Sequence, residues 1–97
     1  MRELTKQESK LYLSWFKGFV VGFREAYDGI PADTGRAWGE VSFFKKRKYK
    51  KTEYNHGYNK GHELYLNVVG KDWDEINPEI YKEWYKRYFL YHHVYKE

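Results

Sequence analysis

The stretch that decides the fold reads WFKGFVVG over residues 15–22, and it recurs as YNHGYNKG over residues 54–61. Both copies follow the pattern aromatic-x-x-Gly-aromatic-x-x-Gly, which in a helix places the two glycines about one turn apart on one face. A glycine inside a helix costs about 1 kcal/mol relative to alanine. We expect close approach of two backbones to compensate for this cost, so the repeat predicts two helices that pack face to face through Gly18, Gly22, Gly57 and Gly61.

End signals extend each copy into a longer helix. Thr5 and Glu8 have the spacing of a capping box, and the helix that they open should run to about residue 27, where Asp28 and Gly29 stop it. Ser14 and Ala26 continue the small-residue row of this helix, and aromatic residues fill most of its remaining surface. The first helix is therefore expected to be central, with neighbours on most sides.

Two further helices are predicted downstream. Thr52 can cap the second helix, which should last to about residue 69 and end at Gly70. Asn77 followed by Pro78 is a strong start signal for a last helix that continues to about residue 95. Its apolar side is expected to consist of Ile80, Trp84, Tyr88, Tyr91 and Tyr95.

Composition supports a folded domain built around aromatic side chains. The 97 residues contain eleven Tyr, six Phe and four Trp, and no Cys that could form a disulfide or a thiolate metal site.

The secondary structure of residues 30–44 is ambiguous, because two glycines weaken a helix there and residues 41–44 are compatible with a short strand or a helical turn. We therefore expect an all-α or mainly α fold: a single small domain, residues 1–97, of three to four helices with an aromatic core.

The charge of the chain is concentrated in one place. Residues 45–51 read KKRKYKK, and their six cations exceed the net charge of +4, so the other residues sum to −2. We call these residues the basic segment. Such a density of positive charge suits phosphates or an acidic protein face. The predicted partner-binding or phosphate-binding residues are Lys45, Lys46, Arg47, Lys48, Tyr49, Lys50 and Lys51.

Other residues are candidates to extend this surface. Cations on the polar side of the first helix can join it if that helix lies nearby, and tyrosines can stack on bases. The predicted extension consists of Lys6, Lys10, Lys17, Arg24, Tyr54, Tyr58 and Lys60. An alternative interpretation of the basic segment is a solvated surface that only aids solubility.

A second interface is predicted on the last helix. Phe89 and Leu90 fall in the sector that carries Lys82, Lys86 and other charged residues. Large apolar residues among charges are typical of a contact with a partner protein or a second copy of the chain. We therefore expect Tyr85, Phe89 and Leu90 to be available for a protein interface.

Two resemblances bear on function. The segment Gly57-Tyr58-Asn59-Lys60-Gly61 resembles the Gly-Tyr-x-x-Gly helix of bacterial ribosome modulation factor, and residues 18–26 are similar to a second segment of that family, although the two occur in the opposite order. This resemblance implies contact with RNA or the ribosome. The overall character of the chain, which is short, free of Cys and rich in Lys and Tyr, resembles small phage-encoded proteins that disable host machinery.

No motif predicts catalysis. The sequence has no phosphate-binding Gly-rich loop and no nucleophile elbow, and His62-Glu63 lacks the second His of a zinc protease motif. His56 and His62 diverge on one helix, as do His92 and His93, so we expect no metal, no cofactor and no enzymatic activity. The longest apolar stretch, residues 11–23, is too short to cross a membrane, which favours a cytoplasmic protein.

The expected function is therefore that of a binding protein encoded by a phage or a mobile element. It would inhibit a host nucleic-acid-handling or defence complex, as an anti-CRISPR protein does. The inhibition would depend on protein–protein interaction through its basic and aromatic surface. The partner would be a host protein or nucleoprotein complex. One alternative is an RNA- or DNA-binding module. Another is a nucleotide-sequestering protein, which needs an aromatic and cationic pocket.

Overall fold

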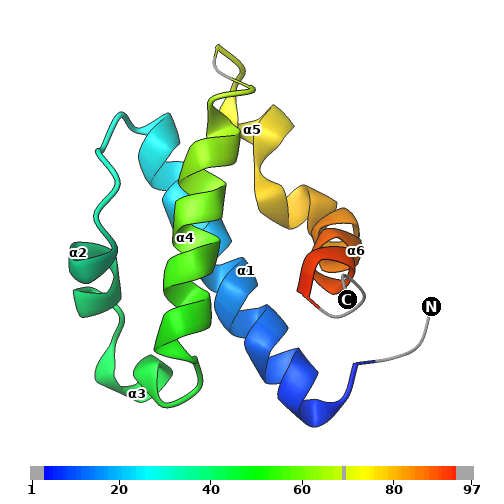
Figure 1. Cartoon of the computed structure of the whole chain (residues 1–97). Helices are drawn as coiled ribbons and strands as arrows, with labels where there is room; N and C mark the ends of the chain where they lie inside the picture. The colour runs from blue at the N-terminus through cyan, green and yellow to red at the C-terminus, as the bar shows by residue number, and fades with distance from the viewer. Residues whose placement is uncertain (1–3, 69, 94–97) are drawn as a thin grey trace.

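A computed structural model of the chain describes residues 4–68 and 70–93 (Figure 1). The elements in chain order are α1 (Lys6–Tyr27), α2 (Thr34–Gly39), α3 (Phe43–Lys46), α4 (Lys51–Tyr65), α5 (Trp73–Ile76), a 3₁₀ turn η1 (Pro78–Tyr81) and α6 (Lys82–His93). Helix α4 lies across α1; α2 and α3 lie on one side of this pair, and α5 and α6 lie on the other (Figure 1). The described residues contain no strand, so the fold is all-α.

Helix α1 begins and ends as its sequence predicts. The Thr5 hydroxyl accepts a hydrogen bond from Glu8 N at 3.1 Å, and the Glu8 carboxylate accepts one from Thr5 N at 3.0 Å, which together form the capping box. At the other end, Gly29 adopts φ +78°, a conformation that favours glycine.

The Cα radius of gyration of 13.2 Å matches the value of about 13 Å for a compact domain of 100 residues.

The interface between α1 and α4 is the glycine contact that the repeat predicts. A Cβ atom at Gly18 would overlap the backbone carbonyl of Tyr54, and one at Gly57 would overlap the carbonyl of Trp15. Gly22 and Gly61 meet the carbonyls of Tyr58 and Phe19 in the same way. Backbone lies against backbone at all four positions, so only glycine fits there, and the prediction is confirmed.

Helix α1 separates two clusters of buried side chains. The larger cluster joins α1 to the end of α4, to α5 and to α6; its members are Tyr12, Trp15, Phe16, Phe19, Phe23, Tyr65, Ile76 and Phe89. The smaller cluster joins α1 to α2 and α4 and contains Ala37, Tyr54 and Tyr58. Aromatic rings supply most of both clusters, which confirms the expected aromatic core.

Two local predictions were wrong, and one that was left open is decided. Helix α4 starts at Lys51 with Lys50 as its N-cap and no side-chain cap, so Thr52 lies inside the first turn, and the helix ends at Tyr65 rather than near residue 69. Residues 43–46 form the helical turn α3, one of the two alternatives expected for residues 41–44, and the Ser42 hydroxyl caps it by accepting a hydrogen bond from Lys45 N at 3.3 Å. Asn77 does cap the next element, but that element is the short η1 turn before α6.

The predicted faces of α6 were also wrong, except at Tyr88, which is half-buried and stacks on Trp15 with the ring centroids 5.9 Å apart. Phe89 and Leu90 are only 1% and 0% exposed, whereas Ile80, Trp84 and Tyr91 are exposed. The Phe89 ring packs against Trp15 of α1, with the ring centroids 5.7 Å apart. Helix α6 carries large apolar or aromatic residues on most of its sides, so the periodicity of the sequence does not show which side is buried. Phe and Leu have no polar side-chain atom, so their burial is favoured over that of Trp or Tyr. The position of Tyr95 falls outside the described residues.

Candidate partner-binding surface

The basic segment forms the corner between α3 and α4. Five of its cations are exposed, and the sixth, Lys46, is half-buried over the Trp38 ring at 5.6 Å. The backbone is held at several points: Lys48 N donates to Lys45 O at 2.9 Å, and Lys50 N donates to the buried Ser14 hydroxyl of α1 at 2.7 Å. The segment is therefore an anchored corner, and a partner need not order its backbone on binding.

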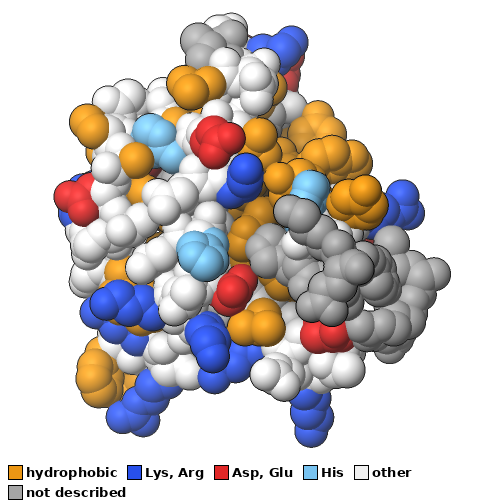
Figure 2. Space-filling view, in the orientation of Figure 1, with side chains coloured by type: hydrophobic (Ala, Val, Ile, Leu, Met, Phe, Trp, Pro, Cys, Tyr) orange, Lys and Arg blue, Asp and Glu red, His pale blue; other side chains and the backbone are white. Residues whose placement is uncertain are grey.

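Two exposed aromatic residues stand directly before the basic segment. Phe43 is 69% exposed and Phe44 is 78% exposed, and the Arg47 guanidinium lies 5.1 Å from the centre of the Phe43 ring. Figure 2 shows blue side chains and an orange group together around α3, at the lower left. Neither residue was predicted as part of the site, although an apolar pair beside a charge cluster was the same signal that we assigned to Phe89 and Leu90.

Two of the three tyrosines near the charge, Tyr54 and Tyr58, are not available for the predicted stacking. Tyr54 and Tyr58 lie in the core, and only Tyr49 remains half-exposed, packed against Tyr54 with the ring centroids 6.1 Å apart. Burial, together with the negative charge of Glu25, raises the pKa of Tyr54 to about 12. The inclusion of Tyr54 and Tyr58 in a contact surface was therefore wrong, because both rings are buried in the smaller cluster together with Ala37 of α2.

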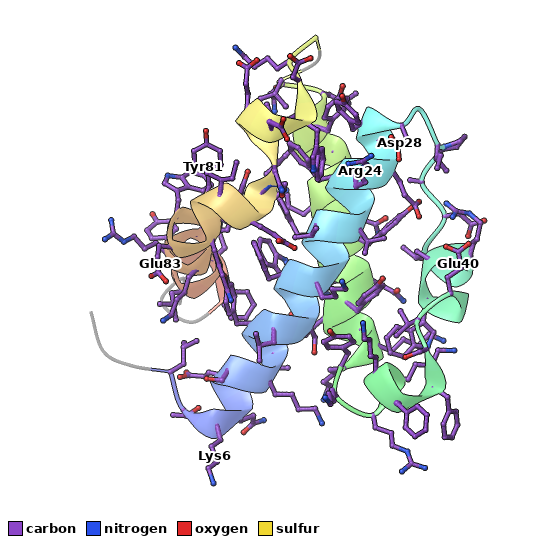
Figure 3. The ribbon with its side chains drawn as sticks, turned by 180° about the vertical axis from the view of Figure 1, so that it is seen from behind. Lys6, Arg24, Asp28, Glu40, Tyr81 and Glu83 are labelled. Atoms are coloured by element: carbon purple, nitrogen blue, oxygen red, sulfur yellow. The ribbon has the colours of Figure 1, made fainter. Side chains whose placement is uncertain are left out.

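The predicted cationic extension is divided among several places. Lys17 is half-buried and borders two grooves beside Tyr49, so it adjoins the basic segment. Arg24 lies toward the other end of α1, where it pairs with Asp28 at 3.2 Å and covers the Trp73 ring at 4.6 Å (Figure 3). Lys60 pairs with Glu63 of α4 at 3.6 Å. The structure therefore brings Lys17 to the basic segment and separates Arg24 from it.

The two remaining lysines of the predicted extension belong to the N-terminal part of α1. Lys6 and Lys10 are both exposed, and Lys6 stands at the tip of the helix (Figure 3). Neither lines the grooves beside Tyr49.

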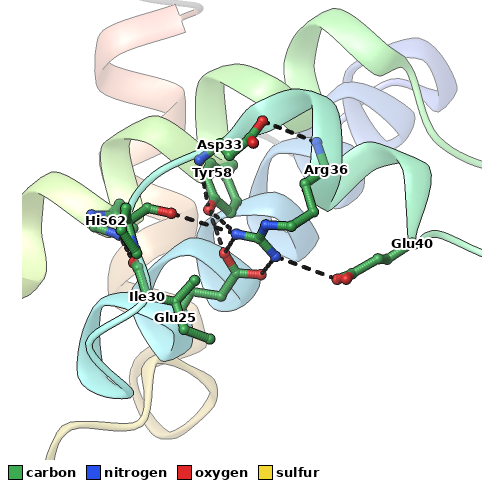
Figure 4. Close-up of polar contacts among 8 residues, drawn as sticks. Glu25, Ile30, Asp33, Arg36, Glu40, Tyr58 and His62 are labelled. Atoms are coloured by element: carbon green, nitrogen blue, oxygen red, sulfur yellow. Dashed lines mark hydrogen bonds and ion pairs between the residues drawn. The ribbon is translucent and has the colours of Figure 1, made fainter.

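A partly buried ionic network, which was not predicted from the sequence, holds α2 against α1 and α4 (Figure 4). Arg36 donates to both carboxylate oxygens of Glu25, at 2.6 and 3.1 Å, and the Tyr58 hydroxyl donates a hydrogen bond to the same carboxylate. The Tyr58 oxygen also accepts from Asp33 N at 3.1 Å. His62 Nε2 lies 2.7 Å from the carbonyl oxygen of Ile30 and secures the loop before α2.

The electrostatics of this network are those of a stable ion pair. Burial opposes the charge on Glu25, but hydrogen bonds from Arg36 and Tyr58 and the positive charge of Arg36 outweigh it, so the pKa of Glu25 lies below its usual value. Burial and the Glu25 carboxylate raise the pKa of Tyr58. Both groups thus keep their usual protonation states at neutral pH, and their partners satisfy them, so the network serves to position α2 and the loop that precedes it.

A groove of about 780 Å³ lies on the other side of α1, between the end of α4 and the segment from α5 to α6. Phe23, Leu64 and Ile76 contribute to its walls, and Ile80 and Trp84 are exposed on its border. Tyr85 also lines it. Of the predicted interface on α6, only Tyr85 remains near an apolar surface, since Phe89 and Leu90 are buried.

Other kinds of site are not found among the described residues. No group of three or more His, Asp or Glu side chains in residues 4–68 and 70–93 is arranged to hold a metal ion. No helix in this part of the chain is long and apolar enough to cross a membrane. No protein-family model, curated protein or solved structure matches the chain.

Proposed function

We propose that the chain is a non-enzymatic binding protein that docks on an acidic face of a host nucleic-acid-handling or defence complex and thereby inhibits it. The docking surface consists of the basic segment together with Phe43 and Phe44. In this proposal the protein is encoded by a phage or a mobile element and acts in the cytoplasm. The observation that carries the proposal is the exposure of two large apolar rings directly beside six clustered cations.

The composition of this surface supports a protein partner. Exposed aromatic residues that enter a partner's pocket supply much of the binding energy of protein interfaces, while surrounding charges steer association and set specificity. Nucleic-acid-processing enzymes gather carboxylates around their catalytic metal ions, and a compact cationic corner is complementary to such a site. The burial of Tyr54 and Tyr58 removes two of the rings that a base-stacking platform would need.

The electrostatics of the free protein favour an anionic partner. Six cations in seven residues repel one another. Lys50 and Lys51 also stand at the N-terminus of α4, where the helix dipole favours negative charge. A carboxylate-rich face brought against this corner relieves both repulsions.

Affinity capture tests the proposal. Immobilised protein is incubated with bacterial lysate with and without nuclease, and captured proteins are identified and assayed for inhibition. We expect a nucleic-acid-processing protein to be retained after nuclease treatment, and to be lost with the double variant Phe43→Ser and Phe44→Ser. The matched control is Leu66→Ser with Ile80→Ser, because these two residues are also large, apolar and exposed.

The outcomes separate the alternatives. Capture that nuclease abolishes, together with direct binding of purified RNA or DNA, would replace the proposal with a nucleic-acid-binding module. Equal capture by the phenylalanine variant and the control would refute a docking role for Phe43 and Phe44.

A further inference from the structure

A second groove, of about 470 Å³, crosses the face of α1 that α4 does not cover. Figure 3 looks onto this face, with η1 and α6 on one side and α3 on the other. Phe16 and Lys17 of α1 line the groove, together with Lys48 and Tyr49 of the basic segment, Glu79 of η1 and Lys82 of α6. We call it the lysine groove. Its volume lies within the range of about 300–1,000 Å³ that small-molecule sites occupy.

The lining of the lysine groove is cationic. Three lysines and one glutamate give it a net charge of +2, and the three lysines come from α1, from the basic segment and from α6. Lys17, Lys48 and Lys82 form no ion pair with another residue of the described part of the chain. Three lysines that line one groove from separate elements, none of them in an ion pair within the described residues, are suited to an anion that carries more than one charge.

The backbone that presents these lysines is held in place. The Tyr12 hydroxyl of α1 donates to the carbonyl of Lys82 at 3.1 Å, which fixes the start of α6 against α1. On the opposite side, the hydrogen bond from Lys50 N to Ser14 fixes the end of the basic segment against the same helix. Both sides of the groove are therefore attached to α1, so the site is largely formed before a ligand arrives.

The groove also has an apolar part. Phe16 and the half-exposed Tyr49 contribute aromatic rings, and Leu13 and Val20 of α1 lie beside them. A ligand that matches the groove combines a multiply charged anionic end with a flat, weakly polar body that can lie on an aromatic ring. Phosphates attached to a nucleobase have this combination.

We propose that the lysine groove binds a nucleotide, with its phosphates near Lys17, Lys48 and Lys82 and its base on Tyr49. The lining offers few groups that could read the edge of a base, chiefly the Tyr49 hydroxyl and the Glu79 carboxylate, so binding discriminates little between bases. The groove shares Lys48 and Tyr49 with the proposed docking surface, but Lys17 and Lys82 lie outside that surface and Phe43 and Phe44 do not line the groove. The nucleotide is either free in solution or one residue of a single strand.

Calorimetry with defined ligands tests this inference. The parent protein is titrated at low ionic strength with ATP, inorganic triphosphate, adenosine and a ten-residue oligothymidylate. We expect ATP to bind at one site, with triphosphate and adenosine each at least tenfold weaker, because each lacks one half of the complementary chemistry. Binding that requires the oligonucleotide would identify a strand as the source of the nucleotide.

Charge-reversed variants with equal net charge provide the decisive comparison. Lys17→Glu with Lys82→Glu should lower affinity at least tenfold, whereas Lys6→Glu with Lys71→Glu should lower it less than twofold. Both pairs change the net charge from +4 to 0, so the two variants differ only in where the charges were reversed. If Lys17→Glu disturbs folding, as circular dichroism would reveal, the exposed single change Lys82→Glu should still lower affinity at least threefold.

Other results would overturn the inference. Absence of ATP and oligonucleotide binding, equal affinity for ATP and triphosphate, or equal losses in the two charge-reversed pairs would each do so. The Phe43→Ser and Phe44→Ser variant should bind ATP as the parent does, so failure of the docking proposal and failure of this one remain distinguishable.

Discussion

Substitution of Gly18 by alanine should destabilise the protein even though alanine is the better helix former. The added Cβ would overlap the backbone carbonyl of Tyr54, which cannot rotate away as a side chain could. Overpacking costs about 1–3 kcal/mol, and the upper end applies because the obstacle is backbone. The gain in helix propensity is about 1 kcal/mol. The free energy of unfolding should therefore fall by about 2 kcal/mol.

Thermal and urea unfolding measure this loss. For a domain of this size, about 2 kcal/mol corresponds to a decrease of roughly 8–16 °C in Tm. Gly35→Ala in α2 is the matched control: its Cβ would lie 3.5 Å from the nearest atom, the Asp33 carboxylate oxygen, an ordinary contact. That variant should be as stable as the parent or up to about 1 kcal/mol more stable. A Gly18→Ala protein as stable as Gly35→Ala would refute the close backbone contact.

Three further predictions concern α6, the ionic network and the basic segment. Leu90→Ala should cost about 2–5 kcal/mol, measured by urea unfolding, because the side chain is fully buried, whereas exposed Trp84→Ala should cost much less; equal losses would contradict the burial pattern. The pKa of Glu25 is lower in the folded protein than its usual value of 4.5. The ionised carboxylate therefore adds to the free energy of unfolding at pH values above 4.5, and this contribution is lost as the pH falls through the pKa of the folded state. Unfolding of Glu25→Gln should therefore depend less on pH in this acidic range than unfolding of the parent, and parallel pH profiles would argue against the network. Replacement of the six cations of the basic segment by Gln changes the net charge from +4 to −2. Association with the partner, measured by surface plasmon resonance, should become slower and lose its salt dependence, while Tm should change little. Unchanged association rates would mean that the segment is only a solvated surface.

Helix ends could be predicted from the sequence where the residues that cap the helix are neighbours in the chain. The capping box of Thr5 and Glu8 was readable because both partners lie within one helical turn. The start of α4 was misplaced because Lys50 has no side-chain cap, so the sequence offers no local sign of that boundary. Helix existence was therefore predictable, and its ends were predictable only where a cap marks them.

The candidate surface was predictable in part. The basic segment is exposed as expected, since a dense run of charges is not buried without partners. The exposure of Phe43 and Phe44 and the burial of Phe89 and Leu90 were both missed, because each depends on which neighbour covers the residue. The network of Glu25, Arg36 and Tyr58 joins three helices, so no single segment carries a sign of it.

The sequence by itself determined that this protein is helical, that its core is aromatic and that two helices meet through Gly18, Gly22, Gly57 and Gly61. These properties follow from the spacing of the residues and from the absence of a Cβ atom in glycine. The sequence alone gives both. Only the tertiary structure decided which side of α6 is buried, which aromatic residues remain exposed, and that Lys17, Lys48 and Lys82 surround one groove. Those properties depend on distances between segments far apart in the chain, which are established only when α1 is enclosed by its neighbours.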